Sequence, residues 1–160
     1  MDDQQLPSLE IRDSAMTALK GWLDGLEGES EFADAVAAVV VDEESELDRW
    51  FVRINGVAKD VYSVWFELGE RTLAYETFVM PAPEENHAAF FEQLLVRNDR
   101  FRDIAFTIGA EQAIFLKGRL DLAHVAEESL DRVLGSMYAA VEQSFQPALR
   151  LGFASRFATD

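Results

Sequence analysis

Three stretches of alternating apolar residues constrain the fold of this chain more than any other feature. They cover residues 49–54, 61–68 and 71–80, and within each stretch one alternate set of side chains is largely apolar. A period of two residues is typical of a β-strand with two different faces. Asn55-Gly56 favours a tight hairpin after the first stretch, and Gly69-Glu70 favours a glycine-first turn after the second. The sequence therefore predicts an antiparallel meander of three strands.

Helical spacing is found on both sides of the meander. Apolar residues recur at steps of three or four in three segments that we predict to be helices, namely 8–26, 87–95 and 130–145. Two short alternating segments, 104–108 and 113–117, predict two more strands. We expect Pro147 to end the last helix, because proline lacks the backbone N–H that a helix interior needs.

Residues 32–41 fit two interpretations. The apolar side chains between Phe32 and Val39 suit a short helix, whereas Val39, Val40 and Val41 alone suit a strand. We favour a helix or irregular structure here. The predicted order is then α-β-β-β-α-β-β-α, an α+β fold in which helices pack on an antiparallel five-stranded sheet. No linker or repeat divides residues 1–160, so we expect a single domain.

The charge of the chain limits its partners. The formal net charge is -16, and the segment 24–48 holds ten acidic residues with no lysine or arginine. Such a chain is repelled by nucleic acid and by anionic membranes, so we expect neither as a partner. The acidic segment is either a solvated connection or an acidic face that docks a basic partner. No cysteine is present, and the first ten residues have no apolar core of a signal peptide. We therefore expect a cytoplasmic protein.

Motifs for chemistry are weak. His124 precedes Glu127 and Glu128, but zinc catalysis normally needs more histidine than this, so we expect no metal site. Ser136 lies in a helical stripe without the glycines of a nucleophile elbow. Glycine-rich phosphate loops are missing from the sequence, and we expect no cofactor. The sequence predicts a protein that is not an enzyme; an enzyme would need a cleft with carboxylates of raised pKa.

The meander carries more aromatic residues than one face of a sheet needs. They fall on both alternate sets of side chains, so one set is core and the other is covered by a helix, a second subunit or a bound peptide. We predict a partner-binding surface that includes four of them: Trp50, Trp65, Tyr75 and Phe78.

The sequence resembles the YbjN family in its actinobacterial form. The resemblance is carried by the stretches 64–66, 75–87, 94–98, 105–111, 130–138 and 150–157, in matching order and spacing. It is poor over residues 1–48, which include the acidic segment 24–48. The resemblance implies the fold of type III secretion chaperones, which commonly dimerise. The family is described as sensory transduction regulators and as peptide-binding, chaperone-like proteins, and it supplies no catalytic residues.

Two functions follow as expectations. The first is a cytoplasmic, homodimeric, non-enzymatic protein that holds a peptide segment of a partner protein in an apolar groove. The second is a regulatory domain that senses a small molecule, for which Arg97, Asn98 or His87 would converge on a closed pocket. Binding of a small molecule in such a pocket would raise the melting temperature, whereas the first function predicts no such shift.

Overall fold

A computed structural model describes residues 5–28 and 30–157 of the chain. Its six strands form one antiparallel sheet in the order β1-β2-β3-β4-β6-β5. The strands are β1 (Val36–Val41), β2 (Asp48–Asn55), β3 (Val61–Leu68), β4 (Thr72–Met80), β5 (Ala105–Ile108) and β6 (Ile114–Asp121). The helices are α1 (Leu9–Leu26), α2 (His87–Asn98) and α3 (Glu127–Gly152), with short 3-10 turns η1 (Ala110–Gln112), η2 (Leu122–His124) and η3 (Ala154–Arg156).

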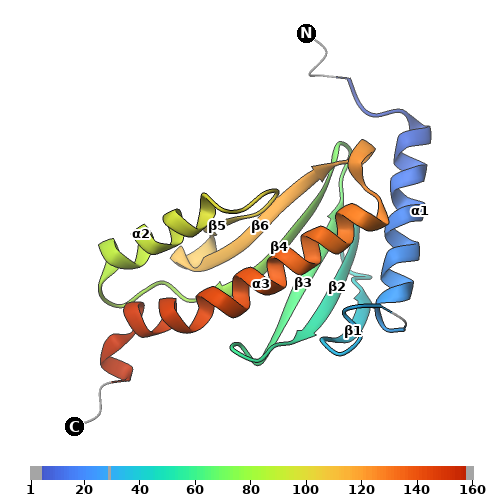
Figure 1. The fold of residues 1–160 in the computed structure, drawn as a ribbon. Coiled ribbons are helices and arrows are strands. Elements are labelled where there is room, and N and C mark those ends of the chain that lie inside the picture. The colour runs from blue at the N-terminus through green and yellow to red at the C-terminus, as the bar shows by residue number, and fades with distance from the viewer. Residues whose placement is uncertain (1–4, 29, 158–160) are drawn as a thin grey trace.

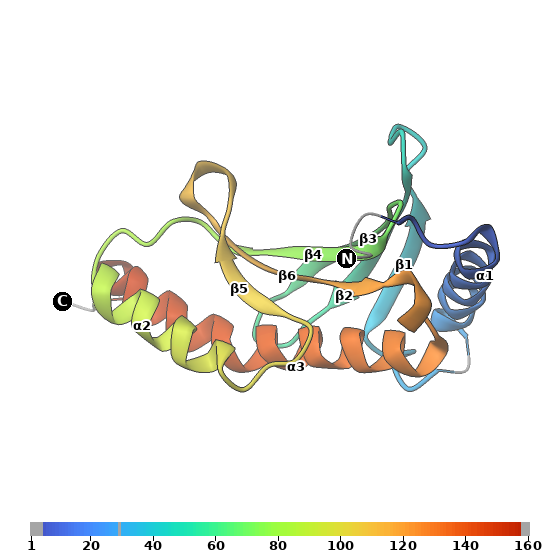
Figure 2. The same cartoon turned by 90° about the horizontal axis from the view of Figure 1, so that it is seen from above.

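All three α-helices lie on one side of the sheet. Figure 2 shows α2 and α3 side by side beneath the strands, and Figure 1 shows α1 standing at the β1 end. The two long helices, α1 and α3, present apolar stripes to the sheet, as their spacing predicted. The result is an α+β fold of two layers, with helices on one face of the sheet only.

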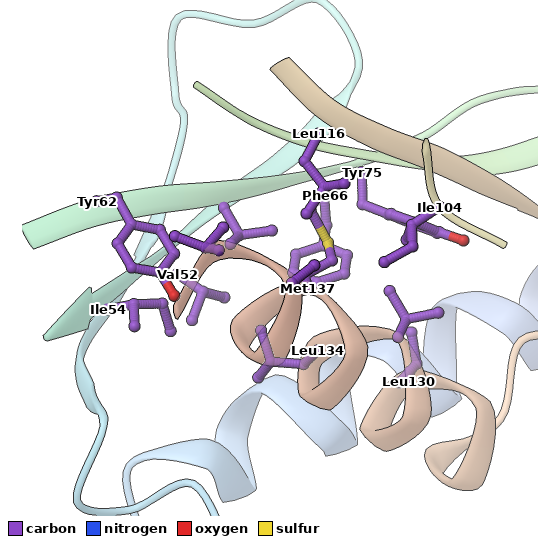
Figure 3. Close-up of a cluster of buried hydrophobic side chains, with 14 of the residues drawn as sticks. Val52, Ile54, Tyr62, Phe66, Tyr75, Ile104, Leu116, Leu130, Leu134 and Met137 are labelled. Carbon is purple, nitrogen blue, oxygen red and sulfur yellow. The ribbon is translucent and has the colours of Figure 1, made fainter. Parts of the chain in front are cut away.

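The core lies between that face and the helices. Buried side chains of the meander, such as Val52 and Phe66, meet Leu134 and Met137 of α3 (Figure 3). Trp22 of α1 adds an edge-to-face contact with Phe66, with ring centroids 5.3 Å apart. One continuous cluster of buried apolar residues therefore joins the helices to every strand of the sheet.

The prediction from the sequence did not include one of the strands. Residues 36–41, for which we favoured a helix or irregular structure, form β1, so the sheet has six strands and not five. β1 pairs with β2, with Val40 opposite Phe51 and Val41 opposite Trp50. The run of three valines decided the outcome, because β-branched side chains suit a pleated surface better than a helix.

The turns and the last helix also differ from expectation. The β2–β3 loop spans residues 56–60 and is longer than the predicted tight turn. The β3–β4 connection is a two-residue turn, as predicted, but it is centred on Glu70 and Arg71, one residue later than expected. No glycine among the described residues has a positive φ. α3 continues past Pro147 to Gly152. The final turn is kept by packing, since Ala148 is buried and Gly152 lies against the ring of Phe90.

Candidate interaction surface

The face of the sheet opposite the helices is uncovered by any helix of the described residues; we call it the open face (Figure 2). The register of the ladders aligns its side chains across the sheet. Its central row runs Val40, Phe51, Trp65, Glu76, Lys117 and Ala105, one residue from each strand. This row alternates with the buried set because successive side chains of a strand point to opposite faces.

The four aromatic residues that we predicted as a surface divide between the two faces. Trp50 and Tyr75 are core residues, 7% and 0% exposed, and are covered by the helices. Trp65 is half-buried and Phe78 is 44% exposed, and both belong to the open face. The buried Tyr75 hydroxyl donates a hydrogen bond to the carbonyl oxygen of Asp103 at 2.6 Å. On the open face, only Trp65 and Phe78 of the predicted set can therefore meet a partner.

An arginine covers part of the Trp65 ring. The guanidinium carbon of Arg49 lies 4.4 Å from the centroid of Trp65 and 5.3 Å from that of Phe51. The same guanidinium pairs with Asp42 and Glu67, each at 3.8 Å. These interactions bring two aromatic rings and one cation together on the open face.

Phe78 is the centre of a second aromatic group on this face. Its ring meets the ring of Phe115 edge to face, with centroids 5.7 Å apart. Lys59 lies over Phe78 at 5.0 Å, and its Nζ donates to the carbonyl oxygens of Phe78 (2.7 Å) and Val79 (2.8 Å). Burial lowers the pKa of Lys59 from 10.5 to about 8, because the charged amine loses water.

The open face is hollowed beside Trp65. A depression of about 420 Å³ is lined by Trp65, Ala74, Tyr75, Glu76, Ala105, Thr107, Lys117, Gly118 and Arg119. Small side chains such as Ala74 and Ala105 leave the space, while the longer side chains of Glu76 and Lys117 also line it. The hydroxyl of Thr107 is buried and has no hydrogen-bond partner among the described residues. The depression thus offers apolar contact, charges of both signs and an unused polar group.

Sequence reasoning missed Arg49, Phe51 and Phe115 as members of this surface. A signal was present: apart from Asp48 at the start of β2, the charged residues of β2, β3 and β4 belong to the open set. Trp50 and Tyr75 belong to the other sets, in which Asp48 is the one charged residue, and they are buried. The charge content of each set, more than its aromatic content, separates the two faces.

The residues named for a small-molecule pocket do not converge. The Asn98 side chain accepts a hydrogen bond from the N–H of Phe106 (2.7 Å) and donates to its carbonyl (3.2 Å). Arg97 lines a separate depression along α2, and His87 is exposed at the first residue of that helix. A closed pocket built on these three residues is therefore not formed.

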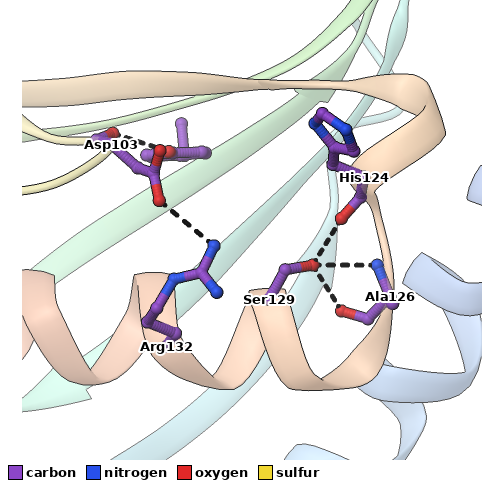
Figure 4. Close-up of polar contacts among 6 residues, drawn as sticks. Asp103, His124, Ala126, Ser129 and Arg132 are labelled. Atoms are coloured by element: carbon purple, nitrogen blue, oxygen red, sulfur yellow. Dashed lines mark hydrogen bonds and ion pairs between the residues drawn. The ribbon is translucent and has the colours of Figure 1, made fainter.

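The residues around His124 serve the start of α3. Ser129 accepts a hydrogen bond from the N–H of Ala126 at 2.9 Å, and its oxygen lies 2.7 Å from the carbonyl of His124 (Figure 4). Arg132, one turn later, pairs with Asp103 at 3.1 Å.

Within residues 5–28 and 30–157, no group of three or more His, Asp or Glu side chains is arranged to hold a metal ion. No helix in the same two ranges combines the length and apolar character needed to cross a bilayer.

Known structures and sequences resemble this chain to different degrees. A chain of the heterodimeric ExoU–SpcU complex, from the type III secretion system of Pseudomonas aeruginosa, shares 12% of its sequence with a TM-score of 0.47; the match covers 66% of this chain and 88% of that one.

Mycobacterial proteins give stronger sequence matches. An uncharacterized protein of Mycobacterium leprae is 37% identical over 109 residues, 68% of this chain and 59% of that protein. A Mycobacterium tuberculosis relative, also uncharacterized, is 34% identical over 104 residues, 65% of this chain and 57% of its own length. The match therefore spans less than two thirds of either relative. The model of the YbjN family, described as "Putative bacterial sensory transduction regulator", matches residues 17–150. This match begins within α1, includes α2 and every strand of the sheet, and ends two residues before the end of α3. The chain belongs to the YbjN family.

Proposed function

We propose that this protein binds a segment of a partner polypeptide on the open face, without catalysing a reaction. The observation that supports this most directly is the set of half-buried and exposed aromatic side chains on a sheet face that no described helix covers. Aromatic side chains of this kind are enriched at the energetic centres of protein interfaces. The description of the family as a regulator is compatible with a role in which binding itself is the activity.

The chemistry of the open face favours an extended, mixed apolar and polar segment. Trp65 and Phe51 provide flat apolar contact, while Lys117 and Arg119 add positive charge beside the depression. Apolar burial of this kind contributes about 25 cal/mol per Å², from which the costs of association are subtracted. The partner is thus expected to place an apolar side chain in the depression, with an acidic group beside it.

The apolar groove between α2 and β5 supports the homodimer that we expected from the sequence. It has a volume of about 280 Å³ and is lined mainly by apolar side chains, among them Phe91 and Leu94. Leu95 is 67% exposed and Ile108 is 53% exposed at its rim. Light scattering should report a dimer that becomes a monomer in the variant Leu95→Glu; a monomeric wild-type protein would contradict this part of the proposal.

We place the protein in the cytoplasm, since its chain has no cysteine.

The test of the open face compares three variants. Trp65→Ala and Phe78→Ala remove aromatic groups from the open face, and Phe157→Ala removes an exposed ring outside the sheet. A partner captured by the wild-type protein is purified, and its Kd is measured for each variant by titration calorimetry. We expect Trp65→Ala to weaken binding about 30-fold, as for an interface hot spot, and Phe157→Ala to leave it unchanged. Equal Kd values for all variants, with intact folding by circular dichroism, would refute the proposal.

The sensing function has less support. The depression holds the unpartnered Thr107 hydroxyl and charges of both signs, as a small polar ligand would need. It lies open on the sheet, however, and the three residues expected to converge do not. A thermal-shift screen with metabolites tests this alternative: a large rise in melting temperature would favour a sensor.

A further inference from the structure

The first edge of the sheet has unpaired backbone groups. β1 pairs with β2 only, because it is the last strand on its side of the sheet. The N–H of Asp42 donates to the carbonyl of Arg49 at 2.9 Å. This bond shows which residues of β1 direct their backbone groups toward β2. In an antiparallel pair, alternate residues direct their N–H and C=O groups to the neighbour and away from it. Val39 and Val41 therefore direct theirs outward, away from β2.

One of these outward groups is capped by a side chain. The N–H of Val39 donates to Glu27 Oε1 at 2.5 Å. The carbonyl of Val39 and both backbone groups of Val41 have no hydrogen-bond partner among residues 5–28 and 30–157. Val41 is 57% exposed, so these groups are accessible to another chain. An edge of this kind is a template on which a further strand can pair.

A hollow of about 230 Å³ lies beside this edge, between α1 and β1. It is lined by Lys20, Leu23, Asp24, Glu27, Val39, Val41 and Trp50. Because Val39 and Val41 point into the helix side of the sheet, alternate side chains of a strand added at this edge would enter the hollow. Leu23 and Trp50 offer apolar contact to the stem of such a side chain, and the carboxylates of Asp24 and Glu27 outnumber the one ammonium group, that of Lys20, in the lining. Neither carboxylate forms an ion pair with any residue that the structure describes.

The charge of the surrounding chain selects the occupant. The segment 24–48 carries ten acidic residues and no lysine or arginine, and β1 lies within it. Two copies paired through β1 would bring both acidic segments together, and like charges facing each other across a strand pair are destabilising. A basic segment has the opposite effect, since its cations approach unpaired carboxylates. Lysine and arginine also bury their apolar stems while their charged ends stay in water.

We propose that the β1 edge binds, by strand addition, an extended partner segment whose helix-side residues are lysine or arginine. This surface is distinct from the open face, so it adds a second contact to the proposed function and is tested independently of it. Backbone hydrogen bonds to the carbonyl of Val39 and to both backbone groups of Val41 provide the pairing, and the hollow beside α1 provides the preference for basic side chains.

The experiment uses short fluorescent peptides that alternate valine with lysine. Two matched peptides serve as controls. In one, every lysine is replaced by glutamate, and in the other the backbone amides that would pair carry N-methyl groups. Two variants test the site on the full-length protein. Val41→Pro removes an outward N–H at the β1 edge, and Phe157→Ala, which removes an exposed ring outside the sheet, is the control. Proline is tolerated at such positions because the lost N–H does not belong to the ladder.

We expect the lysine peptide to bind at least about tenfold more tightly than either matched peptide. Val41→Pro should lower that affinity by about the same factor, and Phe157→Ala should not change it. The double variant Asp24→Asn with Glu27→Gln should remove most of the preference for lysine over glutamate. Equal affinities for the lysine and glutamate peptides, or unchanged binding by Val41→Pro, would overturn the proposal.

A measurement on the wild-type protein covers the case in which Val41→Pro does not fold. Backbone amide chemical shifts are followed by NMR during titration with the lysine peptide. Shifts centred on Val39 and Val41 support strand addition at the β1 edge. Shifts confined to β5 or to the open face would overturn it, as would self-association of the free protein that Val41→Pro abolishes. If the open face fails its own test, this result still stands or falls by itself.

Discussion

Gly118 is the position at which a single methyl group should do most damage. It lies on β6 opposite Tyr75, on the helix side of the sheet. A Cβ atom built at Gly118 would come 1.8 Å from the carbonyl oxygen of Asp103 and 2.8 Å from Cε2 of Tyr75. That carbonyl is the acceptor of the Tyr75 hydroxyl hydrogen bond. The variant Gly118→Ala must therefore push the Asp103 backbone away and lose the bond that fixes Tyr75.

The size of the effect follows from these two losses. Overpacking a core costs about 1–3 kcal/mol, and a lost internal hydrogen bond adds about 1 kcal/mol. We expect Gly118→Ala to lower the free energy of unfolding by about 3 kcal/mol, a large part of the total for a domain of this size. The melting temperature should fall by roughly 10 °C. Urea unfolding, followed by the fluorescence of the buried Trp22 and Trp50, measures the change.

Gly21 provides the matched control. It is exposed on α1, where the nearest atom to a built Cβ is Glu127 Oε1 at 4.0 Å. Alanine is the better helix former, so Gly21→Ala should raise the free energy of unfolding by about 0.5–1 kcal/mol. The reasoning is refuted if Gly118→Ala unfolds within about 0.5 kcal/mol of the wild type, the range of an ordinary surface substitution.

Two further predictions concern polar groups. Asn98→Ala leaves the N–H and C=O of Phe106 without their side-chain partner, and should lower the free energy of unfolding by about 1–2 kcal/mol in urea titrations. Lys59 makes stability depend on pH, because burial lowers its pKa to about 8 while the unfolded lysine keeps 10.5. Between these two pKa values the unfolded chain binds more protons than the folded protein, so the free energy of unfolding should rise with pH. From pH 8 to 9.5 the rise should be about 1 kcal/mol after allowance for the partial exposure of Lys59. The variant Lys59→Met should remove this rise. Above pH 10 the sign should reverse, since burial also raises the pKa values of Tyr62 and Tyr75, which stay protonated in the folded state only. An Asn98→Ala variant as stable as the wild type, or a flat pH profile, would contradict these expectations.

The meander and the helices could be predicted because local patterns and tertiary packing agree there. The alternation in β3 and the helical stripe of α3 are both long, and each places its apolar set in the same core. β1 could not be assigned, because a short apolar run fits a strand and a buried helix equally well. The helix was also expected to end at Pro147, where contacts of Ala148 and Gly152 with the core outweigh the loss of one backbone hydrogen bond.

The aromatic character of the open face was predicted from the sequence, but its membership only in part, and the binding of a partner there stays a prediction. Aromatic residues on both sets of side chains indicated an excess over one core, and the structure leaves Trp65 and Phe78 on the open face. Which set was open depended on where the helices pack, a property of the whole fold. Trp50 and Tyr75 were included because their size was weighed without the charge content of their neighbours. Phe51 and Arg49 were missed for the same reason.

The one-sided placement of the helices separates folding from recognition at the level of single residues. Along β3, Tyr62, Val64 and Phe66 are sealed against the helices, whereas Ser63 and Trp65 look outward. Substitutions at every second position can therefore alter what the sheet contacts and leave the buried layer as it is. Changes to a few outward side chains should therefore alter the proposed binding by the open face without disturbing the fold, provided that the cation at Arg49 is kept or replaced together with the rings it covers.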